Sequence, residues 1–307
     1  MKKLSVLLLA GVLSIGVLGG CGSSSQDTAA SDTAATENTE TETAAEPAEA
    51  PAEESNEGEA ATEAVTLKIA ASATPHAEIL EKAKPILAEQ GINLEITVFD
   101  DYVQPNEVVE SGEFDANYFQ HQPYLDSFNE EKGTHLVSVG WIHYEPFGIY
   151  PGTKSSLEDI EDGDTIAVPN DTTNEARALL LLQDNGIIKL KEGAGLTATK
   201  NDIEENPHNI EIVELEAAQV ARVVNETAFV VLNGNYALEA GYSVAKDSLA
   251  YESSSSEAAK TYVNVITVHE DRADDPNIAK LVEVLGSDEI VKYINDTYDG
   301  AVVPFVK

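Results

Sequence analysis

The chain has 307 residues, of which 55 are acidic and 18 are basic, and its formal net charge is −37. So large an excess of negative charge argues against nucleic acid as a partner and against electrostatic attachment to anionic lipid. The single cysteine excludes an intrachain disulfide.

The N-terminus has the pattern of an export signal. Lys2 and Lys3 precede an almost wholly apolar stretch at 4–17, which is shorter than a membrane-spanning helix requires. The sequence Leu-Gly-Gly-Cys that ends at Cys21 resembles a bacterial lipobox, in which the cysteine is lipidated and becomes the new N-terminus. We therefore predict a signal peptide at 1–20 and a protein anchored by lipid at the extracytoplasmic face of the cell membrane.

Residues 22–64 are rich in Ser, Thr, Ala, Glu and Pro and contain no aromatic residue. Such a composition buries too little apolar surface to fold, and its like charges extend the chain. We predict a disordered acidic tether at 21–64, which starts at the lipidated cysteine.

From residue 65 onward, strand and helix patterns alternate. This order predicts an α/β fold with mainly parallel sheets flanked by helices. The pattern restarts near residue 155, so we expect two lobes, one formed by 65–152 plus about 245–307 and the other by about 153–244, with a ligand cleft between them. Strands are predicted at 66–71, 94–99, 114–119, 165–168, 210–215, 228–232 and 262–268, a strand plus a crossover at 136–150, and helices at 78–90, 105–110, 122–131, within 169–186, 217–224, 277–285 and 289–298.

The stretch 169–186 holds the first candidate site. Several N-cap residues open a helix there, and Asn174 and Arg177 share one face of its first turns. The free N–H groups of a helix N-terminus and a guanidinium together suit a small anion, such as the carboxylate of an amino acid. Arg177 is one of three arginines in an acidic chain, and a surface ion pair is the alternative role for it.

Amides and aromatics follow several predicted strands. A set of this kind suits a small zwitterion with an apolar side chain, although asparagines are common in turns and aromatics in cores. The histidines show no zinc-like spacing, and no nucleophile elbow, Walker loop or dinucleotide fingerprint is present, so we expect no metal, no cofactor and no enzymatic activity. These strand-end residues include Tyr102, Phe119, His121, Asn233 and Asn264.

Together these stretches resemble the methionine-binding lipoprotein family of the NlpA/MetQ type, the solute receptors of methionine ABC importers. The resemblance covers nearly all of 66–307, in the family's order. It is carried by FDDYVQPN at 99–106, FDANYFQH at 114–121, VPND at 168–171 with Asn174 and Arg177, LLLLQ at 179–183, GIIKLK at 186–191, DI at 202–203, ENP at 205–207 and YVNVI at 262–266.

The resemblance implies a two-lobed, periplasmic-binding-protein-like fold that closes on methionine, most simply L-methionine, and delivers it to an ABC permease. It implies that Arg177 and Asn174 hold the ligand carboxylate. It also implies amide contacts from Asn233 and Asn264, and a pocket wall that includes Tyr102, Phe119 and His121.

The sequence departs from the family pattern at 150–154, YPGTK, and at 232–234, LNG, and the run 141–144, WIHY, is a variable region expected to line the side-chain pocket. D-methionine, a related amino acid or a methionyl dipeptide therefore remain alternative ligands. A surface lipoprotein that acts chiefly as an adhesin is an alternative of another class. An anchored hydrolase would need a nucleophile and base that the sequence does not show.

Overall fold

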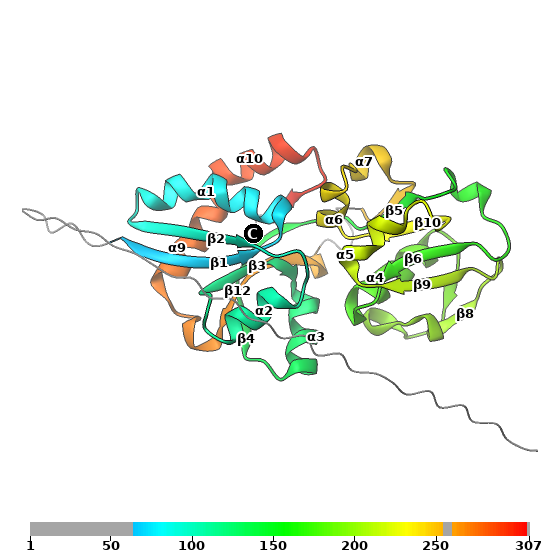
Figure 1. Cartoon of the computed structure of the whole chain (residues 1–307), viewed down its shortest axis with the longest axis horizontal. Coiled ribbons are helices and arrows are strands. Elements are labelled where there is room, and N and C mark those ends of the chain that lie inside the picture. Colours follow the sequence, from blue (N-terminus) through cyan, green and yellow to red (C-terminus); the bar gives the residue numbers. More distant parts are fainter. Residues whose placement is uncertain (1–63, 254–259, 306–307) are drawn as a thin grey trace, which may run out of the picture. The chain divides into compact units, whose positions relative to one another are not determined.

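The computed structural model describes residues 64–253 and 260–305. The predicted signal peptide, Cys21 and residues 22–63 of the tether lie outside this part of the chain. Within it, the predicted strands and helices are present with shifts of a few residues at their ends, and they form two sheets with helices around them (Figure 1).

The first sheet has six strands and belongs to the first lobe. β1 pairs in parallel with β2 and β3, whereas β12 pairs antiparallel with β3 and β4, and β13 pairs antiparallel with β4. In spatial order the strands are β13 (Val303–Pro304), β4 (Leu136–Tyr144), β12 (Val263–His269), β3 (Ala116–His121), β1 (Val65–Ala71) and β2 (Ile92–Val98).

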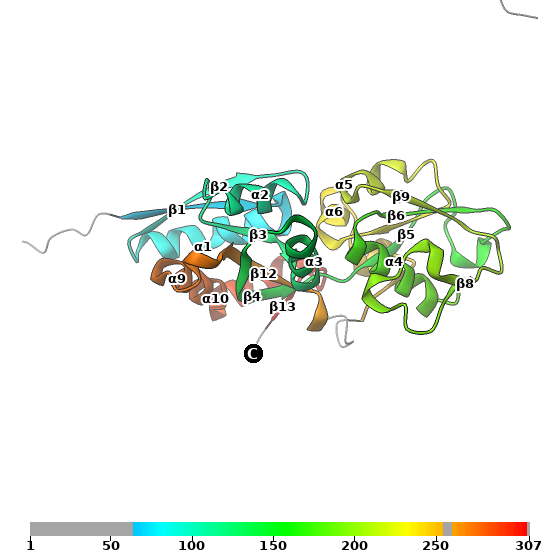
Figure 2. The same ribbon diagram turned by 90° about the horizontal axis from the view of Figure 1, so that it is seen from below.

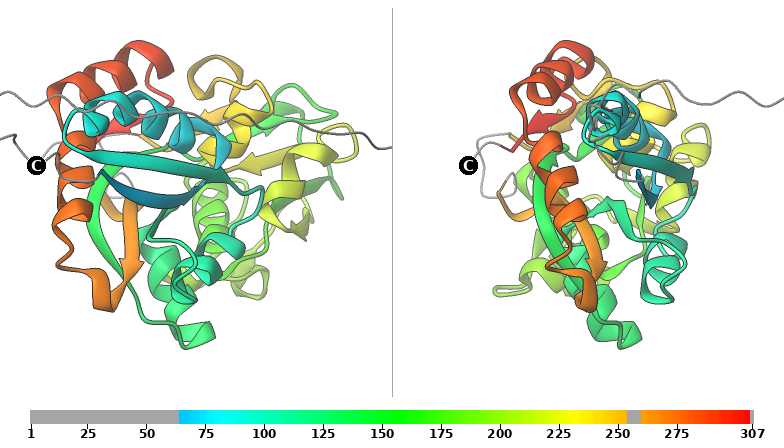
Figure 3. Two further views of the ribbon diagram at one scale, coloured as in Figure 1. Left: turned by 60° about the vertical axis from the view of Figure 1, so that its left-hand side comes forward. Right: turned by 90° about the vertical axis from the view of Figure 1, so that its left-hand side faces the viewer.

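Helices cover both faces of this sheet, as the turned view on the left of Figure 3 shows. Neighbouring strand residues alternate between the two sides: Tyr118 packs in the cluster under α1, α9 and α10, and Phe119 in the cluster under α2 and α3. The five helices are α1 (Glu78–Ala88), α2 (Gln104–Glu110), α3 (Gln122–Lys132), α9 (Pro276–Leu285) and α10 (Asp288–Tyr298).

The second sheet has five strands and a separate set of helices (Figure 2). β6 pairs in parallel with β9 and β10, and β5 pairs antiparallel with β10 and β11. In spatial order the strands are β11 (Ala250–Tyr251), β5 (Gly148–Pro151), β10 (Phe229–Leu232), β6 (Thr165–Pro169) and β9 (Glu211–Leu215); the helices are α4 (Thr172–Asp184), α5 (Ala217–Val220), α6 (Gly234–Glu239) and α7 (Val244–Asp247).

The chain leaves the first sheet earlier, and returns to it later, than the sequence predicts. It leaves the first sheet between β4 and β5, where Pro146 lacks the N–H that a continuing strand would donate. It returns between β11 and β12, because the main chain of Ala250 and Tyr251 pairs with β5. The crossings therefore lie at 145–147 and at 252–262, and not near 152 and 245.

Both sheets are mixed, which corrects the expectation of mainly parallel ones. The expected α/β alternation does give the parallel pairs β1–β2, β1–β3, β6–β9 and β6–β10. Most antiparallel pairs arise where the chain enters a sheet from the other lobe, because β5 and β12 each follow a crossing and run against their neighbours; the short β13, which follows α10, also runs against β4. The sequence also did not predict the small antiparallel pair β7 (Lys189–Leu190) and β8 (Ile203–Glu205).

Candidate functional site: an enclosed pocket between the two sheets

A pocket with about 320 Å³ of empty volume lies where the ends of strands from both sheets meet. β3, β6 and β10 supply their carboxyl ends or the residues that directly follow, as is usual for ligand sites in open α/β sheets. All seven residues expected to bind a ligand line this pocket. The lining residues are Tyr102, Phe119, Gln120, His121, Tyr124, Glu145, Asn174, Arg177, Asn233, Gly234, Asn235 and Asn264.

His121 connects the first lobe to the second. It ends β3 and caps α3, where its Nδ1 accepts the backbone N–H of Tyr124 at 3.1 Å. Burial, together with the nearby positive charge of Arg177, lowers the pKa of His121 to about 3, so the ring is neutral. Because Nδ1 accepts, the ring proton is on Nε2, which donates to Asn174 Oδ1 at 3.0 Å.

Asn174 is the centre of a buried amide network. Its Oδ1 also accepts Asn233 Nδ2 at 2.9 Å, and its own Nδ2 donates to both carboxylate oxygens of Asp171, the N-cap of α4. Asn233 Oδ1 is buried and has no hydrogen-bond partner among the described residues. A buried oxygen of this kind is costly unless a ligand donates to it.

Arg177 is 4% exposed and forms a buried ion pair that the sequence did not predict. Its Nε donates to Glu252 Oε1 at 2.8 Å, and its Nη2 donates to Glu252 Oε2 at 2.5 Å and to the carbonyl oxygen of Glu145 at 2.9 Å. Burial alone would raise the pKa of Glu252, but the adjacent guanidinium holds it below its usual value. These bonds hold the guanidinium in a fixed orientation beside the pocket.

Aromatic rings of the first lobe form an apolar wall of the pocket, and Tyr236 of the second lobe packs against Tyr102 outside the lining. The Tyr102 ring lies 5.7 Å from the Phe119 ring and 5.0 Å from the Tyr236 ring, measured between centroids. The Tyr102 hydroxyl donates to Asn235 Oδ1 at 2.5 Å, and the Tyr236 hydroxyl donates to the carbonyl oxygen of Asp100 at 3.0 Å. These bonds satisfy the polar tips of the tyrosines and leave ring faces for an apolar ligand chain.

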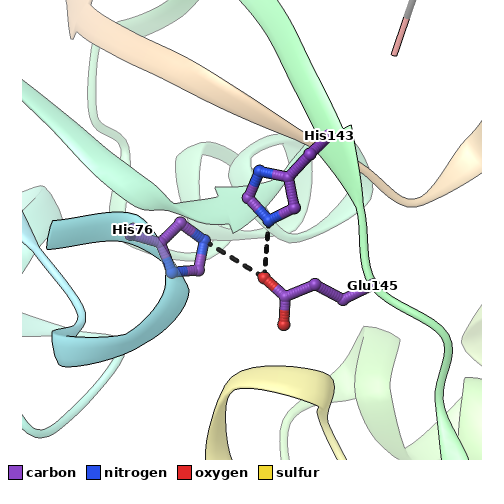
Figure 4. A group of neighbouring side chains, drawn as sticks. All are labelled: His76, His143 and Glu145. Atoms are coloured by element: carbon purple, nitrogen blue, oxygen red, sulfur yellow. Dashed lines mark hydrogen bonds and ion pairs between the residues drawn. The ribbon is translucent and has the colours of Figure 1, made fainter. Parts of the chain in front are cut away.

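Glu145 is a second charged residue of the pocket that the sequence did not predict. It lies between the lobes at the β4–β5 crossing and is 5% exposed. The histidines His76 and His143 both approach its Oε1, at 3.4 Å and 2.7 Å (Figure 4). The sequence does contain a signal that could have singled out Glu145, because it is an acidic residue inside an otherwise apolar and aromatic run.

The run 141–144 does not line the pocket, which corrects the sequence-based expectation. Trp141 is 39% exposed, and His143 and Tyr144 are buried outside the pocket wall. The next residue, Glu145, is the one that reaches the pocket. Side chains alternate along β4, and a pattern of apolar residues does not give the register at which such a strand ends.

Within the described part of the chain, the fold brings together two groups of residues with metal-binding side chains. They are His76 with His143 and Glu145, and Glu110 with His135 and His269; in each group the donor atoms lie within 4.8 Å of one another. Sequence spacing could not show either group, because the members come from separate elements. None of the helices in residues 64–253 and 260–305 has the length and apolar character needed to cross a bilayer.

Comparison with known proteins agrees with this architecture. The NlpA lipoprotein family model matches residues 67–306. The D-methionine-binding lipoprotein MetQ of Salmonella typhimurium is 43% identical over 229 residues, which cover 74% of this chain and 83% of the relative.

Two solved structures are similar as well. The crystal structure of a protein from Ruminococcus gnavus is 78% identical and covers 78% of this chain and 99% of its own, with a TM-score of 0.78. The structure of a nutrient-binding protein from Burkholderia cenocepacia bound to methionine is 42% identical and covers 78% of this chain and 100% of its own, with a TM-score of 0.75.

Two mixed α/β lobes that enclose a polar and aromatic pocket define the class of two-lobed, periplasmic-binding-protein-like solute receptors. Within that class, the chain belongs to the NlpA lipoprotein family.

Proposed function

We propose that this protein captures methionine, most simply L-methionine, outside the cell membrane and delivers it to the permease of an ABC importer. The observation that carries the proposal is the pocket itself, which combines a buried arginine, several amides and an aromatic wall. The methionine-bound relative at 42% identity and the relative named as D-methionine-binding support methionine as the ligand, in either configuration.

Arg177 and Asn174 are assigned to the ligand carboxylate. The guanidinium is fixed by Glu252 and by the Tyr262 ring, 4.2 Å from its central carbon, so it is oriented before a ligand arrives. The guanidinium is the donor proposed for a carboxylate oxygen. Asn174 lies one helical turn away on the same face of α4, and its amide must give up a bond to Asp171 to contact the ligand directly.

Asn233 and Asn264 are assigned to polar contacts through their amides. Asn233 Oδ1 is a buried acceptor that suits the ligand ammonium group. Asn264 Oδ1 lies 3.0 Å from His76 Nε2, which fixes that amide at the pocket wall. Tyr102, Phe119 and His121 enclose the thioether chain, for which soft sulfur–aromatic contacts are favourable.

Closure of the lobes follows from the same residues. His121 and Asn174 join β3 to α4, and Tyr102 and Asn235 join the first lobe to α6. A buried zwitterion needs both of its charges paired, so the closed form is favoured when the ligand supplies the missing partners. This closed form is the state proposed to dock on the permease.

Calorimetry with the full chain tests the proposal after bound ligand has been removed by unfolding and refolding. L-methionine, D-methionine, a methionyl dipeptide and leucine are titrated separately. Saturable 1:1 binding of a methionine form, with much weaker binding of leucine, is expected. A refolded protein that binds none of these ligands would contradict the proposal and favour an interaction role for a surface lipoprotein.

The lipid anchor is a separate part of the proposal and rests on the lipobox at Cys21. Labelling with a radioactive fatty acid in a bacterial host is expected to mark the wild-type chain. The Cys21→Ala variant is expected to stay unlabelled and to appear in the soluble exported fraction. Equal labelling of both chains would contradict lipidation at this cysteine.

A further inference from the structure

Glu145 is a buried carboxyl group in the pocket wall, and burial raises its pKa. Its ion-pair distances within the described part of the chain are to His76 and His143. Burial is the main cause that lowers the pKa of His76 to about 4 and that of His143 to about 3, so both rings are neutral. The two histidines therefore offer Glu145 hydrogen-bond donors but no positive charge, and Arg177, whose charge acts to lower the pKa of Glu145, donates to its backbone carbonyl.

The tautomers of the two rings follow from their other neighbours. Burial keeps the phenol of Tyr118 protonated, because it raises its pKa, so this hydroxyl donates to His143 Nδ1. The proton of His143 is then on Nε2 and is donated to Glu145 Oε1 at 2.7 Å. His76 Nε2 lies 3.4 Å from the same oxygen and 3.0 Å from Asn264 Oδ1, two acceptors that place its proton there as well.

The second carboxylate oxygen has different surroundings. Figure 4 shows both rings turned toward one oxygen of Glu145 while the other points away from them. Oε2 approaches the start of α6 so closely that a Cβ at Gly234 would lie 2.6 Å from it. Gly234 and Asn235 belong to the pocket wall, and the backbone N–H of Asn235 donates to the carboxylate, so Glu145 lies at the pocket wall beside the start of α6.

Arg177 and Glu145 are held next to each other. The Nη2 of Arg177 donates to the backbone carbonyl of Glu145 at 2.9 Å, and both side chains line the same pocket. A guanidinium and a carboxylate placed in this way match the two opposite charges that an amino acid carries on a single carbon atom. The pair thus has the charge pattern of a zwitterion receptor.

We propose that Glu145 binds the α-ammonium group of the ligand, held in position by His76 and His143. This inference rests on the proposed function, and it narrows the ligand to a species with a free ammonium group. An N-acylated or deaminated analogue would leave the buried carboxylate without its cation.

The same three residues form one of the groups with metal-binding side chains. A metal ion at this place would have to replace the Nε2 proton that His143 donates to Oε1 and the Nε2 proton that His76 shares between Asn264 Oδ1 and Oε1. It would also force the proton of His143 onto Nδ1, against the donor from Tyr118. The hydrogen bonds therefore favour an ammonium group over a metal ion, and metal binding becomes an outcome of the test.

The test compares methionine with its hydroxy analogue, 2-hydroxy-4-(methylthio)butanoate, by calorimetry on the ligand-free full chain. The wild type is expected to prefer methionine by about 100-fold, since loss of one partner of a buried charge pair costs several kcal/mol. The Glu145→Gln variant is expected to lose about tenfold or more of its methionine affinity and to bind the analogue within about twofold of the wild type. The Gly234→Ala variant would place a methyl group against Oε2. It is also expected to reduce the preference for methionine over the hydroxy analogue.

The outcomes separate this inference from the proposed function. A wild type that binds neither compound would mean that the proposed function fails. A wild type that binds both compounds equally would overturn the inference but not the proposed function. This comparison needs only the wild type, so it can be made even if Glu145→Gln does not fold. An unchanged preference in a folded Glu145→Gln protein would overturn the inference too. The inference would also be overturned if the wild type bound Zn²⁺ with 1:1 stoichiometry and His143→Gln abolished this binding.

Discussion

The Nε2 of His121 donates to Asn174 Oδ1 at 3.0 Å, and this bond joins the last residue of β3 to the first turn of α4. Both side chains are buried, at 5% and 1% exposure. The bond therefore links the two lobes at the pocket, beside the residues proposed to hold the ligand carboxylate.

The first prediction concerns this link. Asn174→Ala leaves the His121 proton and the Asn233 amide without an acceptor, so methionine affinity should fall by roughly 10- to 100-fold, the cost of two unmade buried hydrogen bonds. Titration calorimetry measures the change. Asn201→Ala, on the exposed turn before β8, is the control and should bind as the wild type does. Equal affinities for both variants would show that the link does not contribute to binding.

The second prediction concerns the buried pair of Arg177 and Glu252. Arg177→Ala should abolish measurable methionine binding and lower the free energy of unfolding by about 3–5 kcal/mol, because it leaves a buried carboxylate unpaired. Arg222→Ala removes an exposed arginine and serves as the matched control.

A double variant, Arg177→Met with Glu252→Leu, separates binding from stability. It removes both charges, so much of the lost stability should return while methionine binding does not. Urea unfolding and calorimetry on the same preparations give the two values. Recovery of binding in the double variant would contradict the role of Arg177 as a ligand contact.

The third prediction concerns histidine titration. Burial lowers the pKa of His76, His121 and His143 to about 4, 3 and 3, whereas the Glu110 carboxylate, through its hydrogen bond and charge, raises that of His135. NMR of the folded protein should show His135 protonating above the usual value and the other three still neutral at pH 5. Protonation of any of the three near pH 6.5 would contradict the buried network.

The same histidines determine how the free energy of unfolding changes with pH. Their neutral form is favoured in the folded state, so their contribution is complete above pH 6.5 and is lost as the pH falls from 6.5 toward 4 and below. Each contributes a slope of up to about 1.4 kcal/mol per pH unit in that window. His143→Gln should reduce the slope measured by urea unfolding between pH 6 and 4.5, and an unchanged slope would argue against a neutral His143.

The fourth prediction concerns a close approach in the second lobe. A Cβ at Gly152 would lie 2.2 Å from the carbonyl oxygen of Thr227, a backbone atom that cannot turn aside. Gly152→Ala should therefore destabilise the protein by about 1–3 kcal/mol through overpacking. Gly286→Ala is the matched control, since its Cβ would meet atoms no closer than 3.5 Å. Similar melting temperatures for the two variants would contradict the packing described for β5.

Much of the fold could be predicted from the sequence because its signals are local. The N-cap at Asp171, the apolar run of α4 and the αL glycine Gly133 each encode a boundary within a few residues. The sheet to which β5 belongs could not be predicted in this way. β5 is a short apolar run. Only its pairing with β10, nearly eighty residues later in the chain, assigns it to the second lobe.

The candidate site was predictable to a similar extent. Arg177, Asn174 and the strand-end amides follow recognisable elements, so their positions could be expected. Glu145 and Glu252 lie on crossings between lobes, where no periodic pattern specifies the direction of a side chain. Their roles depend on contacts with elements far away in sequence, which explains why they emerge only from the structure.

The most direct measurement is a crystal structure of the full chain with methionine. We expect methionine in the pocket, with its carboxylate at Arg177, its ammonium group at Glu145 and its thioether chain against Tyr102 and Phe119. Methionine bound outside this pocket, or bound in it with its carboxylate away from Arg177, would contradict the account.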